Sequence, residues 1–219
     1  MIAAGLGTRM RPLSERWPKS VLPIDGRPVV VTLLHDLAGA GIERFAVVTG
    51  HLGEQVEALV APLPYEIRFA RQREPLGSAH AVSVAEPTPP FVAVAADTRF
   101  RPDDLARFVR EARTADGAVA IRSQPGRPAD TQVHVREGRV VRFREPSPEG
   151  DWTAAPLLAL GPRVARFLLP LPGRPPHELI DVFRLAIDDG AVVSAIQVGR
   201  TRDITSPVDL VRENFPYLR

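Results

Sequence analysis

The chain has 219 residues, a formal net charge of +2 and no cysteine. Its length suffices to bury one substantial core, and so small a charge excess gives no reason to expect a nucleic-acid partner. Without cysteine it cannot form disulfides or thiolate metal sites, which suits a cytoplasmic location, and no apolar run of roughly 18 residues predicts a membrane partner.

Apolar runs alternate with amphipathic stretches along the chain. The runs at 1–4, 45–49, 67–71, 91–96, 118–123 and 192–198 predict strands. The stretches at 29–40, 53–60, 77–85 and 103–113 predict helices. Strands and helices in this order indicate parallel βαβ units.

The second half departs from this alternation. Residues 131–146 predict an antiparallel hairpin around Glu137 and Gly138, and residues 177–189 predict a helix. A last helix follows at 206–215, with Ser206 as N-cap and Pro207 at its first position. We therefore expect one α/β domain over 1–219. Its expected fold is a Rossmann-like three-layer α/β/α arrangement, with a mostly parallel mixed sheet and a small antiparallel β insertion.

A glycine-rich loop directly follows the first predicted strand. Gly5, Gly7 and Thr8 can present successive backbone N–H groups to phosphate oxygens. The loop is neither a P-loop nor a dinucleotide fingerprint, because Met10 stands where the latter needs a third glycine. Lys19 lies just beyond it and is the only lysine among the 28 basic residues of the chain. The alternative is a solvated surface cation, but chance would leave the single lysine at this one of the 28 basic positions only rarely, so the position favours a function.

Residues 5–28, GLGTRMRPLSERWPKSVLPIDGRP, match without gaps the pattern G-x-G-T-R-[ML]-x-P-L-[ST]-x-x-x-P-K-x-[LV]-[LV]-P-[IV]-x-G-[KR]-P. The chain thus resembles the sugar-1-phosphate nucleotidyltransferases, or NDP-sugar pyrophosphorylases. The resemblance implies that the loop, Ala4 included, binds the triphosphate. It also implies two catalytic residues: Arg9 for the β- and γ-phosphates, and Lys19 for the α-phosphate and the incoming sugar phosphate.

A second segment, RQREPLGSAHAV at 71–82, resembles the family motif that binds the base. The resemblance implies nucleotide contacts from Gln72, Gly77 and Ser78. The five-residue spacing of Gln72 and Gly77 is that of members specific for uracil or thymine, where an amide and backbone groups pair with the base. UTP or dTTP is therefore favoured, although guanylyl and cytidylyl members have similar segments. Taken alone, the segment fits a solvated strand end and a helix start equally well.

Two aspartates match the metal-binding positions of the family. Asp97 ends a predicted buried strand, and ligands of open α/β sheets bind at such ends. Asp203 lies in TRDITSPVDL, which resembles the distal motif D-[IV]-G-T-P-x-D-L. The resemblance implies that both carboxylates bind Mg²⁺, a cation that prefers oxygen ligands. The alternative for Asp203 is capping of the last helix, which is weakened because Ser206 already fills that N-cap.

The match weakens toward the sugar-binding half. Glu145 and Pro146 remain where the family has E-K-P, but the lysine is missing, and Arg142 or Arg144 is left to hold the sugar phosphate. Gln132 and Pro156 stand near positions where the family has Tyr-Gly and Asn-x-Gly. The five histidines share no metal-ligand spacing, which predicts packing or surface roles: His35, His51, His80, His134 and His177.

The resemblance implies an enzyme that transfers a nucleotidyl group from an NTP to a sugar 1-phosphate and releases pyrophosphate. Residues up to about 115 would bind the nucleotide, and residues from about 116 would bind the sugar and hold the second metal ligand. Two alternatives stay open: a non-catalytic relative that binds nucleotide sugars as a sensor or partner subunit, and an enzyme whose acceptor is a phosphorylated alcohol. Family members are often dimers or tetramers, which leaves homo-oligomer formation open as well.

Overall fold

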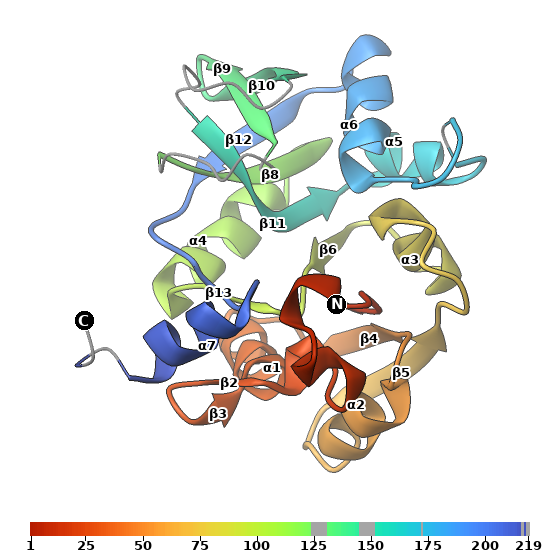
Figure 1. Cartoon of the computed structure of the whole chain (residues 1–219). Helices are drawn as coiled ribbons and strands as arrows, with labels where there is room; N and C mark the ends of the chain where they lie inside the picture. The colour runs from red at the N-terminus through yellow and green to blue at the C-terminus, as the bar shows by residue number, and fades with distance from the viewer. Residues whose placement is uncertain (124–130, 145–151, 172, 216, 218–219) are drawn as a thin grey trace.

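The computed structural model describes residues 1–123, 131–144, 152–171, 173–215 and 217 (Figure 1). Its strands are β1 (Ile2–Ala3), β2 (Pro23–Ile24), β3 (Arg27–Pro28), β4 (Arg44–Thr49), β5 (Glu66–Arg71), β6 (Phe91–Val94), β7 (Thr98–Arg99), β8 (Gly117–Arg122), β9 (Gln132–Arg136), β10 (Arg139–Arg144), β11 (Trp152–Leu160), β12 (Val193–Gln197) and β13 (Arg202–Asp203). Its α-helices are α1 (Val29–Gly39), α2 (Gly53–Val60), α3 (Ser78–Val84), α4 (Pro102–Ala112), α5 (Pro162–Ala165), α6 (Leu179–Asp188) and α7 (Pro207–Asn214). Within these ranges, no helix combines the length and the hydrophobicity that a membrane crossing requires.

The first half of the sheet is parallel. Strands β1, β4 and β5 pair in the order β1-β4-β5, and a parallel bridge from Ile2 to Ala95 joins β1 to the segment after β6. The second half is mixed, in the order β6-β11-β8-β12-β10-β9, and only the β8–β12 pair in it is parallel. A mixed α/β fold containing a parallel sheet is thus confirmed.

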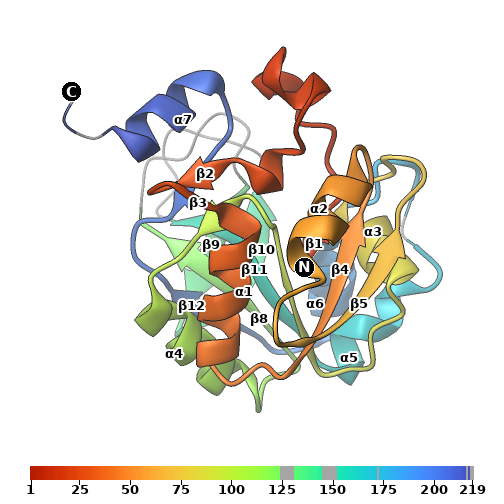
Figure 2. The same cartoon turned by 90° about the horizontal axis from the view of Figure 1, so that it is seen from below.

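Helices cover both faces of the sheet, because side chains alternate between the faces along each strand. In β8, Ala118 and Ala120 belong to a core shared with α1, α2 and α4. The alternate residues Val119 and Ile121 belong to a second core shared with α3, α5 and α6. Figure 2 shows the strands between α1 and α4 on one side and α3 and α5 on the other.

The predicted elements occur with boundaries that differ by no more than two residues. The hairpin forms as β9 and β10, with Glu137 and Gly138 both at positive φ in its turn. Ser206 is the N-cap of α7, and the carboxylate of Asp209 accepts hydrogen bonds from the backbone N–H groups of Ser206, at 2.8 Å, and Thr205, at 3.0 Å.

The nine-residue strand β11 is the main element that the sequence did not predict. It lies between β6 and β8 and is antiparallel to both. It contains Pro156, which normally argues against a central strand because proline has no N–H to donate. Here the β8–β11 register shifts between Ala154 and Leu158, and the Pro156 carbonyl still accepts a bond from Ala95 N–H at 3.0 Å.

The loop after β1 packs tightly against the end of β4, which generates a stability prediction. A Cβ atom added at Gly50 would lie 2.6 Å from the carbonyl oxygen of Ala4. We therefore expect Gly50→Ala to lower the free energy of unfolding by about 1–3 kcal/mol, measured by urea denaturation. Gly39→Ala is the matched control, since a Cβ there meets no atom within 4 Å. In α1 it should be neutral or stabilising by about 0.5–1 kcal/mol, and equal losses from both variants would contradict the close approach.

Candidate active site

The predicted nucleotide-binding residues lie at one edge of the parallel sheet. Parallel strands end at the same edge, and ligands of open α/β sheets bind there. Ala4 follows β1 and Gln72 follows β5, and the predicted metal ligand Asp97 lies shortly after β6. Gln72 is tied to its neighbouring strand because its N–H donates to the carbonyl of Thr49 at 2.8 Å.

The glycine loop leads directly to the lysine. Gly7 has a φ of 60° in the left-handed region, and a Cβ added to it would lie 3.2 Å from the Cβ of Ser14 and 3.6 Å from the Cβ of Lys19. A side chain at this position would be strained and crowded, so glycine lets the loop fold over Lys19. Gly5, Thr8 and Arg9 are exposed beside it.

Lys19 and Asp97 form an ion pair. The ammonium Nζ donates a hydrogen bond to Oδ2 of Asp97, while Oδ1 accepts one from the Thr98 hydroxyl at 3.2 Å. The two side chains are 18% and 26% exposed, so solvent screens the pair less than it would a surface pair. The structure thus brings together the predicted catalytic lysine and a predicted metal ligand from positions 78 apart in the chain.

Asp203 reaches the same place through a short antiparallel ribbon. Strands β7 and β13 pair with Asp203 opposite Thr98, and the N–H of Ile204 donates to the Asp97 carbonyl at 3.3 Å. The Oδ1 atom of Asp203 is buried and has no hydrogen-bond partner within the described parts of the chain. A buried carboxylate oxygen without a partner is costly, so this atom is suited to a ligand.

Arg122, which the sequence analysis did not single out, holds the other Asp203 oxygen. It ends β8, is buried, donates to the Thr201 hydroxyl and lies 3.6 Å from Oδ2 of Asp203. The available signal was a charged residue at the end of the apolar strand AVAI, where a buried cation needs a buried partner.

The predicted base-binding residues are also adjacent. Gln72 is buried, and its Nε2 donates to the Gly77 carbonyl at 3.0 Å and contacts Nδ1 of His80 at 2.9 Å. The same carbonyl accepts the N–H of Ala81 at 3.1 Å, so both of its lone pairs are used inside the protein. Gln72 and Gly77 are the residues expected to contact the base. Of their acceptor atoms, Oε1 of Gln72 accepts no hydrogen bond within the described contacts, so it is available to the base.

His80 therefore orients the Gln72 amide, whereas its sequence context predicted packing or exposure. A neutral imidazole accepts at Nδ1 when Nε2 carries the proton, and that tautomer matches the donor from Gln72. The sequence signal was its position three residues beyond Gly77, on the first turn of α3.

Gly77 and Ser78 lock this turn against the start of α6. A Cβ added to Gly77 would lie 2.3 Å from the carbonyl oxygen of His177, and its φ is 101°. The Ser78 hydroxyl donates to Glu178 and accepts the N–H of Leu179 at 2.8 Å. Within the described contacts, the Ser78 hydroxyl thus links the start of α3 to the start of α6.

The predicted sugar-phosphate residues come at the end of β10 in the sequence. Arg144 is the last residue of β10, opposite Gln132, and its side chain is not among the described parts of the structure. Glu145 and Pro146 lie outside the described residues.

The donor set fits a hard divalent cation completed by phosphate oxygens. Asp97 and Asp203 offer carboxylates, one with an unpartnered buried oxygen. No group of three or more potential ligands (His, Cys, Asp or Glu) able to hold a metal occurs among the described residues. A cation held here would therefore depend on its substrate for further ligands.

A glycine loop, a lysine and two carboxylates thus meet at one edge of this mixed α/β fold. The model of the MobA-like NTP transferase domain matches residues 1–186, and the chain belongs to this family.

Curated relatives and solved structures agree with this assignment. The bifunctional protein GlmU of Thermus thermophilus is 34% identical over 147 residues, which cover 64% of this chain and 31% of GlmU, so the chain spans about a third of that relative. The UTP–glucose-1-phosphate uridylyltransferase AglF of Haloferax volcanii is 29% identical, covering 95% of this chain and 91% of AglF. The fold matches the inositol-1-phosphate CTP transferase from T. maritima with a TM-score of 0.83 at 21% identity, covering 95% of this chain and 89% of that one.

The contact between Arg122 and Asp203 predicts an energetic coupling. Arg122→Met should lower the free energy of unfolding by about 1–3 kcal/mol, because it leaves the Asp203 carboxylate partly buried without its cation. Adding Asp203→Asn removes that uncompensated charge, so the double variant should lose less than the sum of the single losses. A coupling energy of at least about 0.5 kcal/mol from a double-mutant cycle in urea is expected. Strict additivity would show that the two groups do not interact.

Proposed function

We propose that this protein transfers a nucleotidyl group from UTP or dTTP to a sugar 1-phosphate, giving an NDP-sugar and pyrophosphate. The ion pair that joins Lys19 to Asp97, beneath the glycine loop, is the observation that carries the proposal. In the proposal, this compact cation lies between the loop that would bind the triphosphate and the carboxylate that would bind the metal, where the two phosphates would meet. The helices on both faces of the sheet support the three-layer, Rossmann-like interpretation of the fold.

In this proposal the sugar phosphate oxygen attacks the α-phosphorus in line and pyrophosphate leaves. The backbone N–H groups of Gly5, Gly7 and Thr8 would hold the triphosphate, with Ala4 at the start of the loop. Arg9, whose guanidinium fork suits spread phosphate oxygens, would neutralise charge developing on the leaving pyrophosphate. Lys19 would bridge the α-phosphate and the incoming phosphate, reducing their mutual repulsion.

Asp97 and Asp203 would hold Mg²⁺, which supplies charge neutralisation and orientation of the triphosphate when bound. Lys19 would then make two interactions. It holds the Asp97 carboxylate in place through their hydrogen bond, and its positive charge would stabilise the phosphates. Arg122 and Thr201 keep the Asp203 carboxylate oriented, so that the unpartnered Oδ1 stays available.

Base selection would rest on Gln72, supported by Gly77 and Ser78. With Nε2 engaged by Gly77 and His80, Oε1 can accept a hydrogen bond from an N–H of the base. Uracil and thymine offer such a donor at ring nitrogen N3, which supports UTP or dTTP. Cytosine offers its amino group, so CTP belongs in any assay of the protein.

The second half of the chain would bind the acceptor. Residues from about 116 onward, with Arg144 and Glu145 nearest the E-K-P position, would bind the sugar phosphate. The missing family lysine motivates two other outcomes: a phosphorylated alcohol as acceptor, or a nucleotide-sugar sensor without turnover. Pyrophosphate release from a panel of NTPs with sugar 1-phosphates and phosphorylated alcohols separates these cases. Silence across the panel, together with measurable nucleotide binding, would favour the sensor.

Lys19→Ala tests the catalytic assignment directly. We expect kcat to fall about 10²–10³-fold, the loss typical of one preorganised charge stabiliser. The measurement is pyrophosphate release at saturating NTP, and circular dichroism checks that the variant folds. Arg16→Ala is the matched control, since Arg16 is an exposed cation in the same segment, and it should keep full turnover. Full turnover in Lys19→Ala would overturn the role of the lysine.

His80→Ala tests the orientation of Gln72. Losing one neutral hydrogen bond of about 0.5–1.5 kcal/mol should raise the KM for the preferred NTP roughly twofold to tenfold. We expect kcat to change little. The difference in KM between the preferred NTP and other NTPs should become smaller, because the Gln72 amide can rotate once His80 no longer holds it. His35→Ala serves as the control, because His35 lies on α1 and contacts Tyr65 instead of Gln72. An unchanged ratio of KM values for UTP and CTP in His80→Ala would contradict the positioning role.

A further inference from the structure

A hollow lies beside the β7–β13 ribbon, whose strand β13 carries Asp203. Its volume is about 500 Å³, and five of its lining residues are arginines: Arg99, Arg101, Arg200, Arg202 and Arg212. The other lining residues are Asp25, Phe100, Pro102 and Glu213. A volume of this size is in the range of small-molecule sites.

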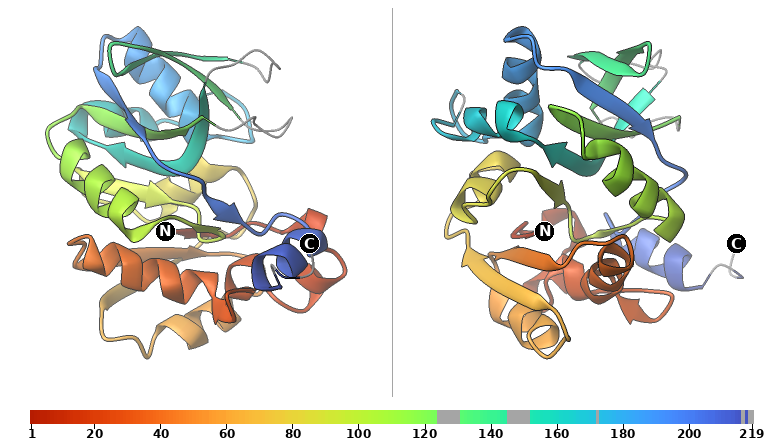
Figure 3. Two further views of the ribbon diagram at one scale, coloured as in Figure 1. Left: turned by 90° about the vertical axis from the view of Figure 1, so that its left-hand side faces the viewer. Right: turned by 180° about the vertical axis from the view of Figure 1, so that it is seen from behind.

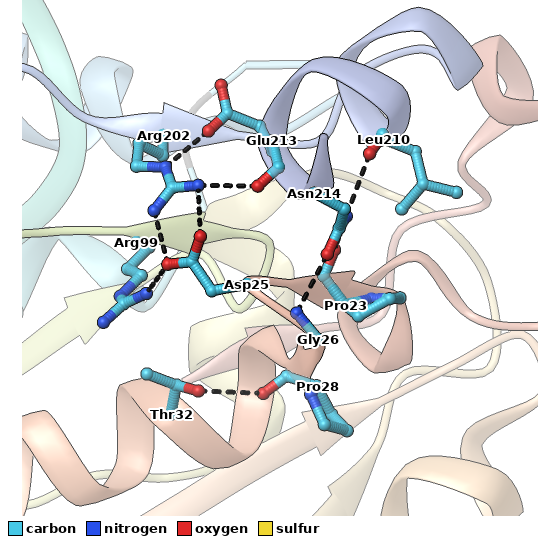
Figure 4. A network of polar contacts seen from close by, with 10 residues as sticks. All are labelled: Pro23, Asp25, Gly26, Pro28, Thr32, Arg99, Arg202, Leu210, Glu213 and Asn214. Carbon is cyan, nitrogen blue, oxygen red and sulfur yellow. Dashed lines mark hydrogen bonds and ion pairs between the residues drawn. The ribbon is translucent and has the colours of Figure 1, made fainter. Parts of the chain in front are cut away.

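Two of the five arginines already have carboxylate partners. Arg202 binds Asp25 through two hydrogen bonds, at 2.6 and 2.9 Å, and its Nε donates to Glu213 (Figure 4). Arg99 donates to the same Asp25 carboxylate. The bond and charge of Arg202 hold the pKa of Asp25 below its usual value. These contacts hold the β2–β3 hairpin against β13 and α7. Helix α7 and the hairpin lie side by side in Figure 3.

The other three arginines have no such partners. Arg101, Arg200 and Arg212 are exposed, and within the described ranges their side chains make no hydrogen bond or ion pair. They come from the start of α4, the segment before β13, and α7, so the fold itself gathers them at one hollow. Among the lining residues, five guanidinium groups face two carboxylates, so the hollow carries an excess of positive charge.

The hollow and the proposed active site lie on opposite sides of the β7–β13 ribbon. Arg202 pairs with Arg99 across the ribbon, and Asp203 pairs with Thr98. Successive side chains of a strand point to opposite faces. Arg202 accordingly contacts Asp25 and Glu213, while Asp203 contacts Arg122 in the active-site region. An anion held by the arginines is therefore separate from one held by the glycine loop.

We propose that Arg99, Arg101, Arg200, Arg202 and Arg212 form a binding site for a compact phosphate-bearing small molecule with two or more negative charges. Guanidinium forks bind phosphate oxygens in a bidentate manner, which favours phosphate over a single carboxylate. Phe100 on the lining is buried, so the hollow offers no open aromatic face on which a nucleic-acid base could stack. Bound there, the anion stabilises the ribbon that keeps Asp97 beside Asp203.

Binding of inorganic pyrophosphate, measured by calorimetry without divalent metal, tests this site. The wild type should bind it, and Arg200→Ala/Arg212→Ala should weaken the site at least about tenfold, the size expected for losing charge-assisted hydrogen bonds. Arg16→Ala/Arg110→Ala removes the same charge from exposed positions elsewhere and should leave Kd nearly unchanged. Arg9→Ala/Lys19→Ala removes the proposed catalytic cations and should leave this site intact.

The variants also separate this site from the catalytic one. If the wild type binds two pyrophosphates, loss of one in Arg200→Ala/Arg212→Ala and of the other in Arg9→Ala/Lys19→Ala supports the proposal. It is overturned if pyrophosphate does not bind, or if Arg200→Ala/Arg212→Ala binds as the wild type does. Equal weakening by the Arg16→Ala/Arg110→Ala control would also overturn it, because general charge would then explain the affinity.

Discussion

The ion pair between Lys19 and Asp97 is the contact on which the rest of the site depends. It fastens the segment after the glycine loop to the turn after β6. Two parts of the sheet edge that are distant in sequence become one surface, with the exposed loop on one side and the carboxylates on the other. A partly buried pair keeps this geometry better than an exposed one, because solvent competes less for its charges.

The C-terminal segment completes that surface from far along the chain. Strand β13 brings Asp203 beside the backbone of Asp97, and Arg122 from β8 holds the Asp203 carboxylate. The same strand presents Arg202 on its other face, where Asp25 and Glu213 bind it. One two-residue strand therefore contributes side chains to two separate places, and each of its faces has its own partners.

Local sequence patterns predicted most of the fold because burial repeats regularly along helices and strands. They missed β11, because the pattern treats Pro156 as a break, and only neighbouring strands show that a register shift accommodates it. For the site, the unbroken match over residues 5–28 identified the loop and Lys19. It could not identify His80 or Arg122, whose roles come from contacts with Gln72 and Asp203.

By itself, the sequence determined the family resemblance, the order of the longer strands and helices except β11, and the residue types suited to phosphate and to a divalent cation. These depend on spacing along the chain, which is visible without a structure. Only the tertiary structure decided that Lys19 contacts Asp97, that the Gly77 carbonyl is engaged by Gln72 and Ala81, and that five arginines line one hollow. Such contacts join residues that are distant in sequence. Strand order and packing bring these residues together, and local periodicity encodes neither strand order nor packing.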